Sequence, residues 1–174
     1  MREGFTLLET LLSIGVVVII IGLVVPAYIQ IGNQQRVSTG ADRLEQIFSQ
    51  AKDNAQSGKK DCTACACNTA GELPLIGWRV NVTNGGGTYT VEGVCSATDY
   101  PGGAPVFFYS HTENFPAGVK AVLSPVPAFP VMFRTGGQGI YPPLSGSNVI
   151  KVTVSGASGT TAKTFTINGA GGIQ

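Results

Sequence analysis

The sequence predicts an α+β protein in which one long N-terminal helix packs on a mostly antiparallel β-sheet domain. Three observations lead to this fold class: an uncharged apolar run near the start, an apolar stripe with helical spacing after it, and short alternating strands separated by glycine-rich turns in the rest of the chain. We expect the first half of the helix to be transmembrane and the second half to be amphipathic, with its apolar face on the sheet.

The composition limits the size and the class of the protein. The chain has 174 residues and a formal net charge of +1, and charged residues make up 12% of it. This length suits one modest domain and an N-terminal segment, and the balanced charge excludes a strongly basic nucleic-acid-binding surface. The 24 glycines and 10 prolines favour many short strands joined by turns.

The apolar run spans residues 11–25, with the sequence LLSIGVVVIIIGLVV, and no charged residue lies between Thr10 and Gln35. The wider segment 5–31 exceeds the roughly 20 residues that a helix needs to cross a bilayer. Valine and isoleucine would also suit a strand, but a lone strand cannot satisfy its backbone polar groups in lipid. We therefore assign residues 5–31 to a transmembrane and assembly helix, which Pro26 should kink.

An amphipathic extension of this helix is predicted over residues 32–58. Apolar residues recur there at steps of three and four, and Ser57-Gly58 provides a helix stop. The stripe consists of Val37, Ala41, Leu44, Ile47, Phe48, Ala51 and Ala55.

The remaining segment, 59–174, has the alternation and turn residues of a β-rich domain. Strands are predicted at 76–82, 88–92, 106–109, 119–123, 131–134, 149–154 and 164–167. Their apolar faces should pack on the stripe of the helix as one mostly antiparallel sheet.

The N-terminus allows three interpretations. In the first, it is a secretory signal peptide that is cleaved near Val25-Pro26-Ala27, although Glu3 cancels the positive charge of Arg2. In the second, it is an uncleaved anchor, which leaves the acidic Glu9 unexplained. The third depends on the order of the residues Gly4-Phe5-Thr6-Leu7-Leu8-Glu9 directly before the apolar run.

This order resembles the class III signal of type IV pilins and type II secretion pseudopilins. The resemblance implies that residues 1–4 are a prepilin leader, and that prepilin peptidase cuts between Gly4 and Phe5 and N-methylates Phe5. Pro26 stands where the helix of this family has its kink-forming proline. The resemblance also implies a single-pass precursor in the cytoplasmic (inner) membrane, an extracytoplasmic head domain at 59–174, and an extracytoplasmic filament after assembly.

The acid at position 9 has a physical role in such an assembly. Cleavage after Gly4 would create an amine at Phe5, and an amine and a carboxylate in lipid offset each other's cost when they pair. The resemblance implies that Glu9 of one subunit meets the Phe5 amine of its neighbour, so Phe5, Glu9 and Pro26 are the predicted assembly residues. The competing interpretation is that Glu9 only extends to the membrane interface.

A second, shorter resemblance concerns the C-terminal half. The turn MFRTGGQG at 132–139, the paired strands after it and the final Ile167-Asn168-Gly169 resemble the end of H-type minor pseudopilins. No run of basic residues near the C-terminus matches the DNA-binding minor pilins of that group.

Cys62, Cys65, Cys67 and Cys95 could bind zinc or form two disulfides. Two disulfides are favoured, because the head domain would lie outside the cytoplasm and the tight C-x-C spacing hinders a tetrahedral site. Of the three possible connectivities, the one with Cys65–Cys67 is the least favourable because its loop is so short. Cys95 should therefore pair with Cys65 or Cys67.

No catalytic, metal or cofactor site is predicted, and the protein is not expected to be an enzyme. The single histidine, His111, has no nucleophile and acid arranged around it in the sequence. Trp78 and the aromatic residues at 107–109 could form a stacking surface for a sugar or a base, but their alternating strands favour the core. Arg134, Lys151 and Lys163 are expected on the solvated surface rather than on phosphates.

The predicted function is a structural subunit of a type IV pilus or a type II secretion pseudopilus. Its partners would be prepilin peptidase, the inner membrane, and other subunits of the same or a related kind. The alternative is a membrane-anchored extracytoplasmic module that binds a sugar or DNA and does not polymerise.

Overall fold

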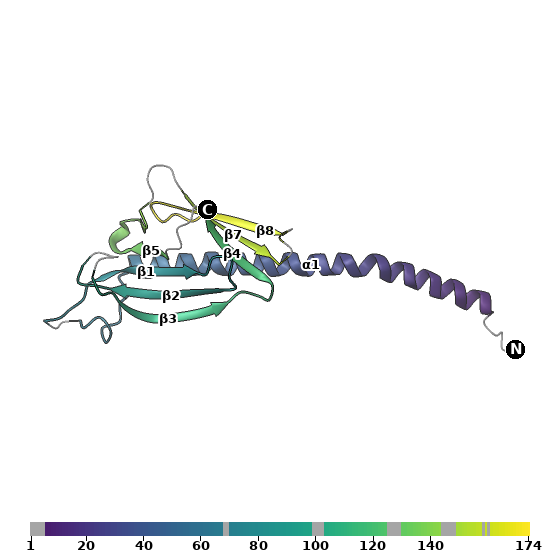
Figure 1. Cartoon of the computed structure of the whole chain (residues 1–174), viewed down its shortest axis with the longest axis horizontal. Helices are drawn as coiled ribbons and strands as arrows, with labels where there is room; N and C mark the ends of the chain where they lie inside the picture. The colour runs from purple at the N-terminus through teal and green to yellow at the C-terminus, as the bar shows by residue number, and fades with distance from the viewer. Residues whose placement is uncertain are drawn as a thin grey trace. The chain divides into compact units, whose positions relative to one another are not determined.

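A computed structural model describes residues 6–67, 70–98, 103–124, 130–143, 149–157, 159 and 161–174, without the side chains of residues 23, 26 and 27. Within these residues the chain forms a helix followed by short strands (Figure 1). The elements in chain order are α1 (Leu7–Gln56), β1 (Leu75–Val82), β2 (Thr88–Cys95), β3 (Val106–Asn114), β4 (Val119–Ser124), β5 (Val131–Arg134), the 3₁₀ turn η1 (Thr135–Gly137), β6 (Ile140–Tyr141), β7 (Val149–Gly156) and β8 (Ala162–Asn168).

The chain divides into two compact units, Met1–Gln35 and Arg36–Gln174. The boundary falls inside α1, so residues 36–56 of the helix belong to the unit that contains the strands. In the first unit, the described part of α1 exposes apolar side chains around the whole helix. In the second unit, α1 buries the predicted stripe almost completely, and Ile47 is the one half-buried member of it.

The strands form two antiparallel sheets. The first has the order β3-β2-β1-β5-β6, and the second has the order β4-β7-β8. The turn between β1 and β2 connects them, because the Gly85 amide donates a hydrogen bond of 2.8 Å to the Ala121 carbonyl of β4. Each predicted strand is present, and the short β6 was not predicted.

The core of this unit lies where both sheets meet α1. Phe48 is fully buried and makes edge-to-face contacts with Phe133 of β5, at 6.2 Å between ring centroids, and with Phe165 of β8, at 5.9 Å. Burial of such a side chain stabilises the fold by about 1.5–3 kcal/mol. At the edge of this core an ion pair joins Asp42 of α1 to Lys163 of β8.

The predicted helix stop ends α1 through a glycine in the left-handed conformation. Gly58 has φ +66°, and its amide donates a 3.3 Å hydrogen bond to the Ala55 carbonyl. The Lys59 amide donates a 3.0 Å hydrogen bond to Asn54, so two carbonyls of the last turn are satisfied. The chain therefore leaves the helix at Lys59 with a defined direction.

The predicted fold class is wrong in two respects. Among the described residues, no helix is long and apolar enough to cross a membrane, which contradicts the expected transmembrane first half of a long N-terminal helix. The strands form two sheets and not one. The physical reason for the second error is that alternation defines which face of a strand is apolar but not which strands pair. Phe48 of α1 contacts both sheets, through Phe133 of the first and Phe165 of the second, so one helix provides apolar surface for two sheets.

Candidate functional site

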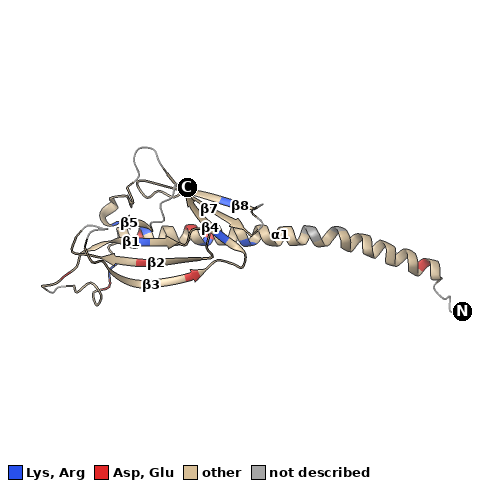
Figure 2. Cartoon of the chain, viewed as in Figure 1, with Lys and Arg blue, Asp and Glu red and all other residues tan. Residues whose placement is uncertain are grey.

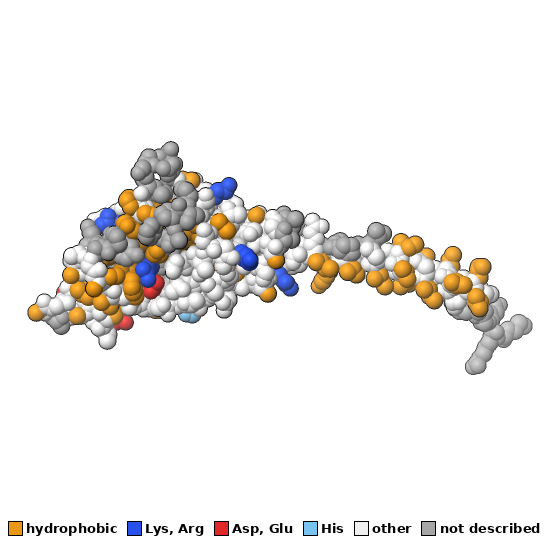
Figure 3. Space-filling view, viewed as in Figure 1, with side chains coloured by type: hydrophobic (Ala, Val, Ile, Leu, Met, Phe, Trp, Pro, Cys, Tyr) orange, Lys and Arg blue, Asp and Glu red, His pale blue; other side chains and the backbone are white. Residues whose placement is uncertain are grey.

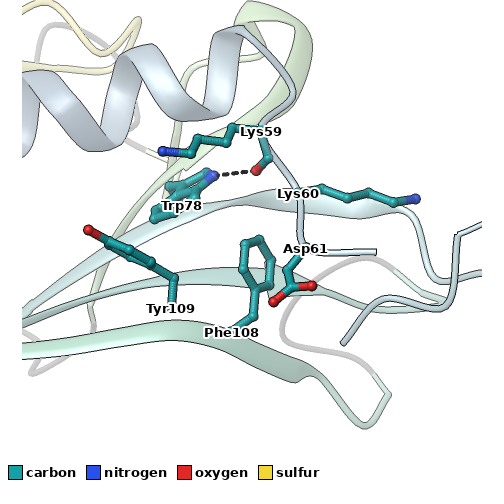
Figure 4. A pocket seen from close by; sticks show the side chains of 6 residues that line it. All are labelled: Lys59, Lys60, Asp61, Trp78, Phe108 and Tyr109. Atoms are coloured by element: carbon teal, nitrogen blue, oxygen red, sulfur yellow. Dashed lines mark hydrogen bonds between the residues drawn. The ribbon is translucent and has the colours of Figure 1, made fainter. Parts of the chain in front are cut away.

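A cavity of about 140 Å³ lies beside the segment that follows α1. It is built from the helix exit, β1 and β3, and Figure 4 shows Phe108 and Tyr109 extending from β3 toward Trp78. The lining residues are Lys59, Lys60, Asp61, Trp78, Phe108 and Tyr109.

Hydrogen bonds fix the wall formed by residues 59–61. The Trp78 indole N–H donates a hydrogen bond of 2.9 Å to the Lys59 carbonyl, which ties the helix exit to β1 (Figure 4). The Lys60 ammonium group donates to the Glu72 carboxylate at 2.6 Å and to the Leu73 carbonyl at 3.3 Å. Asp61 accepts a bond of 2.8 Å from the Thr63 amide.

Two disulfides hold the loop that continues this wall. Cys62 is bonded to Cys67, and Cys65 is bonded to Cys95 at the end of β2. Cys95 thus has one of the two partners that the sequence left open. The second bridge closes a loop of 30 residues, so the segment after α1 is covalently tied to the first sheet.

A bulge in β3 directs Tyr109 toward the cavity. The register between β2 and β3 shifts between Val91 and Gly93, and Tyr109 in the bulge has φ +53°. A non-glycine residue in this left-handed region costs roughly 1–2 kcal/mol. Such strain concentrates at functional sites, so the conformation of Tyr109 indicates that this cavity is a candidate functional site.

Glycine at position 93 makes room for the neighbouring ring. A Cβ atom added to Gly93 would lie 2.1 Å from Cζ of Phe108, so no other residue fits without displacing the ring. The Phe108 ring then packs edge-to-face on Trp78, with 5.4 Å between the centroids, and Tyr109 packs at a tilt, at 5.6 Å. The cavity floor is an ordered group of three rings.

The rings differ in exposure. Trp78 and Phe108 are buried, as predicted for core residues, whereas Tyr109 is 58% exposed. Phe107 is also exposed, at 40%, but its ring lies 3.8 Å from the Arg79 guanidinium and not in the cavity. The prediction of a core position is therefore wrong for Phe107 and Tyr109, because an edge strand leaves one side without a neighbour and the bulge breaks the alternation.

Charges around the cavity are balanced. The Lys59 ammonium group lies 5.7 Å from the Tyr109 ring centroid, on the side opposite to Asp61 in Figure 4, and Lys60 points away. Since Lys60 pairs with Glu72, the residues facing the rings are one cation, Lys59, and one anion, Asp61.

A second cavity of about 130 Å³ shares Tyr109 with the first. Its polar end is a network in which Glu113 accepts a 2.5 Å hydrogen bond from the Tyr89 hydroxyl and contacts His111 at 3.1 Å and Arg43 at 3.9 Å. The Tyr89 hydrogen bond, together with His111 and Arg43, lowers the pKa of Glu113 despite partial burial. Burial and the adjacent carboxylate raise the pKa of Tyr89. His111 itself is exposed and hydrogen-bonded within this network.

The predicted assembly residues are only partly described. Gly4 and Phe5 lie outside the described residues, as does the side chain of Pro26. Glu9 is exposed in the first turn of α1 and is the one charged residue in the described part of the first unit (Figure 2). The structure does not test its predicted pairing with Phe5.

Apolar side chains surround Glu9 along the rest of this unit, as the space-filling view shows on one face (Figure 3). Those that are at least half exposed are Leu7, Leu8, Leu11, Leu12, Ile14, Val16, Val17, Val18, Ile19, Ile20, Ile21, Val24, Val25, Tyr28, Ile29 and Ile31. Their positions cover every face of a helix with 3.6 residues per turn, so the described helix between Leu7 and Ile31 has no continuous polar side.

Within the described ranges, no group of three or more His, Cys, Asp and Glu side chains could hold a metal ion. The four cysteines are all in disulfides. Comparison of the chain with protein-family models, with curated proteins and with solved structures found no match.

Trp78 and residues 107–109 were predicted from the sequence as a possible stacking surface, but residues 59–61 were not predicted to lie beside them. No glycine or proline in β3 signals the bulge at Tyr109. The one available signal was Gly93 in the interior of a strand, which is typical of a bulge or of a close approach by another group.

Proposed function

We propose that this chain is a structural, non-enzymatic subunit of a type IV pilus or a type II secretion pseudopilus, assembled through the N-terminal part of α1. The observation that carries the proposal is the apolar surface of the first unit, which is exposed on all faces of the described helix and includes one charged residue there, Glu9. Apolar areas of this extent are rare on isolated soluble proteins and mark interaction sites. Helices of other subunits, of the same or a related kind, provide the apolar partner.

Glu9 would set the register of this packing. A carboxylate within a bundle of apolar helices is costly unless it finds a cation. Cleavage after Gly4 by prepilin peptidase would supply one, the methylated amine of Phe5 on a neighbouring subunit. The carboxylate then selects one longitudinal position from the many that a uniformly apolar helix surface allows.

The second unit would form the filament surface outside the cytoplasm. Two disulfides among the described residues are consistent with an oxidising compartment. A precursor at the cytoplasmic membrane and an extracytoplasmic filament are the corresponding locations in this proposal.

Intact-mass measurement of the protein isolated from its native cells tests the processing step. The expected species begins at Phe5 and carries one additional methyl group. A species that begins at Met1 or at Tyr28 contradicts the proposal, since the first retains the leader and the second has lost the assembly helix.

Substitution of Glu9 tests the assembly step. Glu9→Gln should abolish incorporation into sheared surface filaments while the amount of protein per cell stays the same, and Glu9→Asp should retain part of it. Asp53→Asn is the matched control, because Asp53 is an exposed acid in the same helix within the second unit. Normal filament incorporation of Glu9→Gln would show that the carboxylate has no assembly role and would favour a binding module that does not polymerise.

A further inference from the structure

We propose that the cavity between Lys59, Asp61 and Tyr109 binds one neutral sugar ring of a glycan. This inference does not depend on filament assembly, because every residue that lines the cavity belongs to the second unit.

The size of the cavity suits one six-membered ring. Its volume is about 140 Å³, close to the roughly 150 Å³ of an engineered protein cavity that holds benzene, so the ring atoms of a pyranose can enter while its hydroxyl groups lie at the open rim. A whole oligosaccharide does not fit in this volume, so the other rings of a glycan would lie outside. The volume thus predicts recognition of one ring.

The floor offers the apolar surface that a sugar ring needs. A pyranose has a face of C–H groups, which packs on an aromatic ring, and a rim of hydroxyl groups. Tyr109 is 58% exposed, whereas Trp78, which packs against it, is 1% exposed, and Phe108, which packs on Trp78, is 6% exposed. Tyr109 is therefore the stacking platform, and its hydroxyl group adds a polar contact.

The rim offers hydrogen-bonding groups of both kinds without a net charge. Lys59 can donate to a sugar oxygen, and Asp61 can accept from a sugar hydroxyl. Asp61 keeps acceptor capacity beyond its one bond to the Thr63 amide, because a carboxylate has about four lone-pair sites. Since Lys60 is paired with Glu72 and Lys59 is balanced by Asp61, the described residues that line the cavity carry no surplus positive charge to attract a phosphate. This balance favours a neutral hydroxylated ligand over a nucleotide.

The strained backbone at Tyr109 supports a binding role. The left-handed conformation of Tyr109 has an energetic cost, and Tyr109 has no partner on β2 in the β2–β3 register. The disulfides and the Trp78–Lys59 hydrogen bond hold the opposite wall in place. Because the cavity is rigid and the Tyr109 ring is already exposed in it, the protein loses little conformational entropy when a sugar binds.

Trp78 provides an internal probe, because it is the single tryptophan of the chain and lines the cavity. We suggest titrating the full chain, in a detergent without a sugar headgroup, with maltotetraose, cellotetraose, mannotetraose and chitotetraose. Saturation-transfer NMR on each tetrasaccharide provides a second measurement that does not depend on Trp78. We expect at least one of them to bind saturably with a dissociation constant near or below about 1 mM.

Two pairs of variants assign the binding to the cavity. Tyr109→Asn should raise the dissociation constant of the tetrasaccharide that binds at least tenfold. Because asparagine tolerates the left-handed backbone, the variant should remain folded. Phe107→Asn, on the adjacent exposed ring that lies under Arg79, should leave the affinity unchanged. Asp61→Asn should weaken binding several-fold, and Asp53→Asn should have no effect.

Three results would overturn the proposal. The first is the absence of a signal from all four tetrasaccharides at about 5 mM in both measurements. The second is binding that Tyr109→Asn leaves intact. The third is saturable binding of glucose 6-phosphate or of an acetylated tyrosine amide with no binding of a neutral sugar, which would assign the cavity to an anion or to a protein side chain. None of these results bears on cleavage at Phe5 or on the role of Glu9, so the two proposals fail separately.

Discussion

The indole N–H of Trp78 donates a hydrogen bond of 2.9 Å to the backbone carbonyl of Lys59, and this bond joins β1 to the residue at which the chain leaves α1. Trp78→Phe removes the donor and part of a fully buried side chain. We expect a loss of about 1–3 kcal/mol in the free energy of unfolding, measured by urea titration with circular dichroism. Tyr28→Phe, at an aromatic residue that is 77% exposed, should change it little.

Gly93 should be intolerant of even one methyl group. In Gly93→Ala the new Cβ would lie 2.1 Å from Cζ of Phe108, and overpacking of this kind costs about 1–3 kcal/mol. Gly71→Ala is the matched control, because no atom other than those of the residue and its two chain neighbours lies within 4 Å of the Cβ position there. In a double-mutant cycle, Phe108→Ala should remove most of the penalty at Gly93, and additive effects of the two substitutions would refute the steric explanation.

The two disulfides should contribute unequally to stability. A chain-entropy argument gives about 3–4 kcal/mol for Cys65–Cys95, which closes 30 residues, and about 2 kcal/mol for Cys62–Cys67, which closes 5. Replacement of each pair by alanine, followed by urea denaturation, measures both contributions. Equal losses would indicate that local contacts of the bridges, and not the constraint on the unfolded chain, determine their effect.

Stability at acidic pH should depend on Glu113. Its pKa is lower in the folded protein than the ordinary value of 4.5, mainly because the Tyr89 hydroxyl donates to its carboxylate. A lowered folded-state pKa stabilises the protein fully above the unfolded-state value, and this stabilisation is lost as the pH falls through the folded-state value. Between pH 7 and pH 3 the wild-type protein should therefore lose more stability than Glu113→Gln.

The matched variant for this experiment is Tyr89→Phe, which keeps the ring in its buried position and removes the hydrogen bond to Glu113. It should bring the acid dependence close to that of Glu113→Gln. An acid dependence equal to that of the wild type would assign the lowered pKa to His111 and Arg43 instead.

Much of the local structure could be predicted from single stretches of sequence. The alternation in β1 and β7, the helix stop at Ser57-Gly58 and the stripe through Leu44 and Phe48 each depend on neighbours within a few residues. The predicted burial is wrong for Phe107 and Tyr109. Both lie on an edge strand with a bulge, where strand periodicity alone does not define which side chains are buried.

The candidate site could be predicted only in fragments. Trp78 and Phe108 were predicted as aromatic residues of strands, whereas Lys59 and Asp61 were not predicted as residues of a site. Their convergence depends on the exit of the chain at Gly58, the pairing of β1, β2 and β3, and the Cys65–Cys95 bridge. Each of these relations joins segments that are distant in the sequence, so no local pattern contains them.

The sequence by itself determined the succession of apolar helix, amphipathic stripe and short strands, because backbone periodicity and turn chemistry act over a few residues. Only the tertiary structure decided that the strands form two sheets on either side of Phe48, that Cys95 pairs with Cys65, and that Tyr109 turns its ring toward Trp78. The physical reason is that strand pairing, the disulfide partner and the bulge geometry are all selected by the packing of one core. This packing depends on contacts between segments that are distant in the sequence, and local sequence patterns do not contain those contacts.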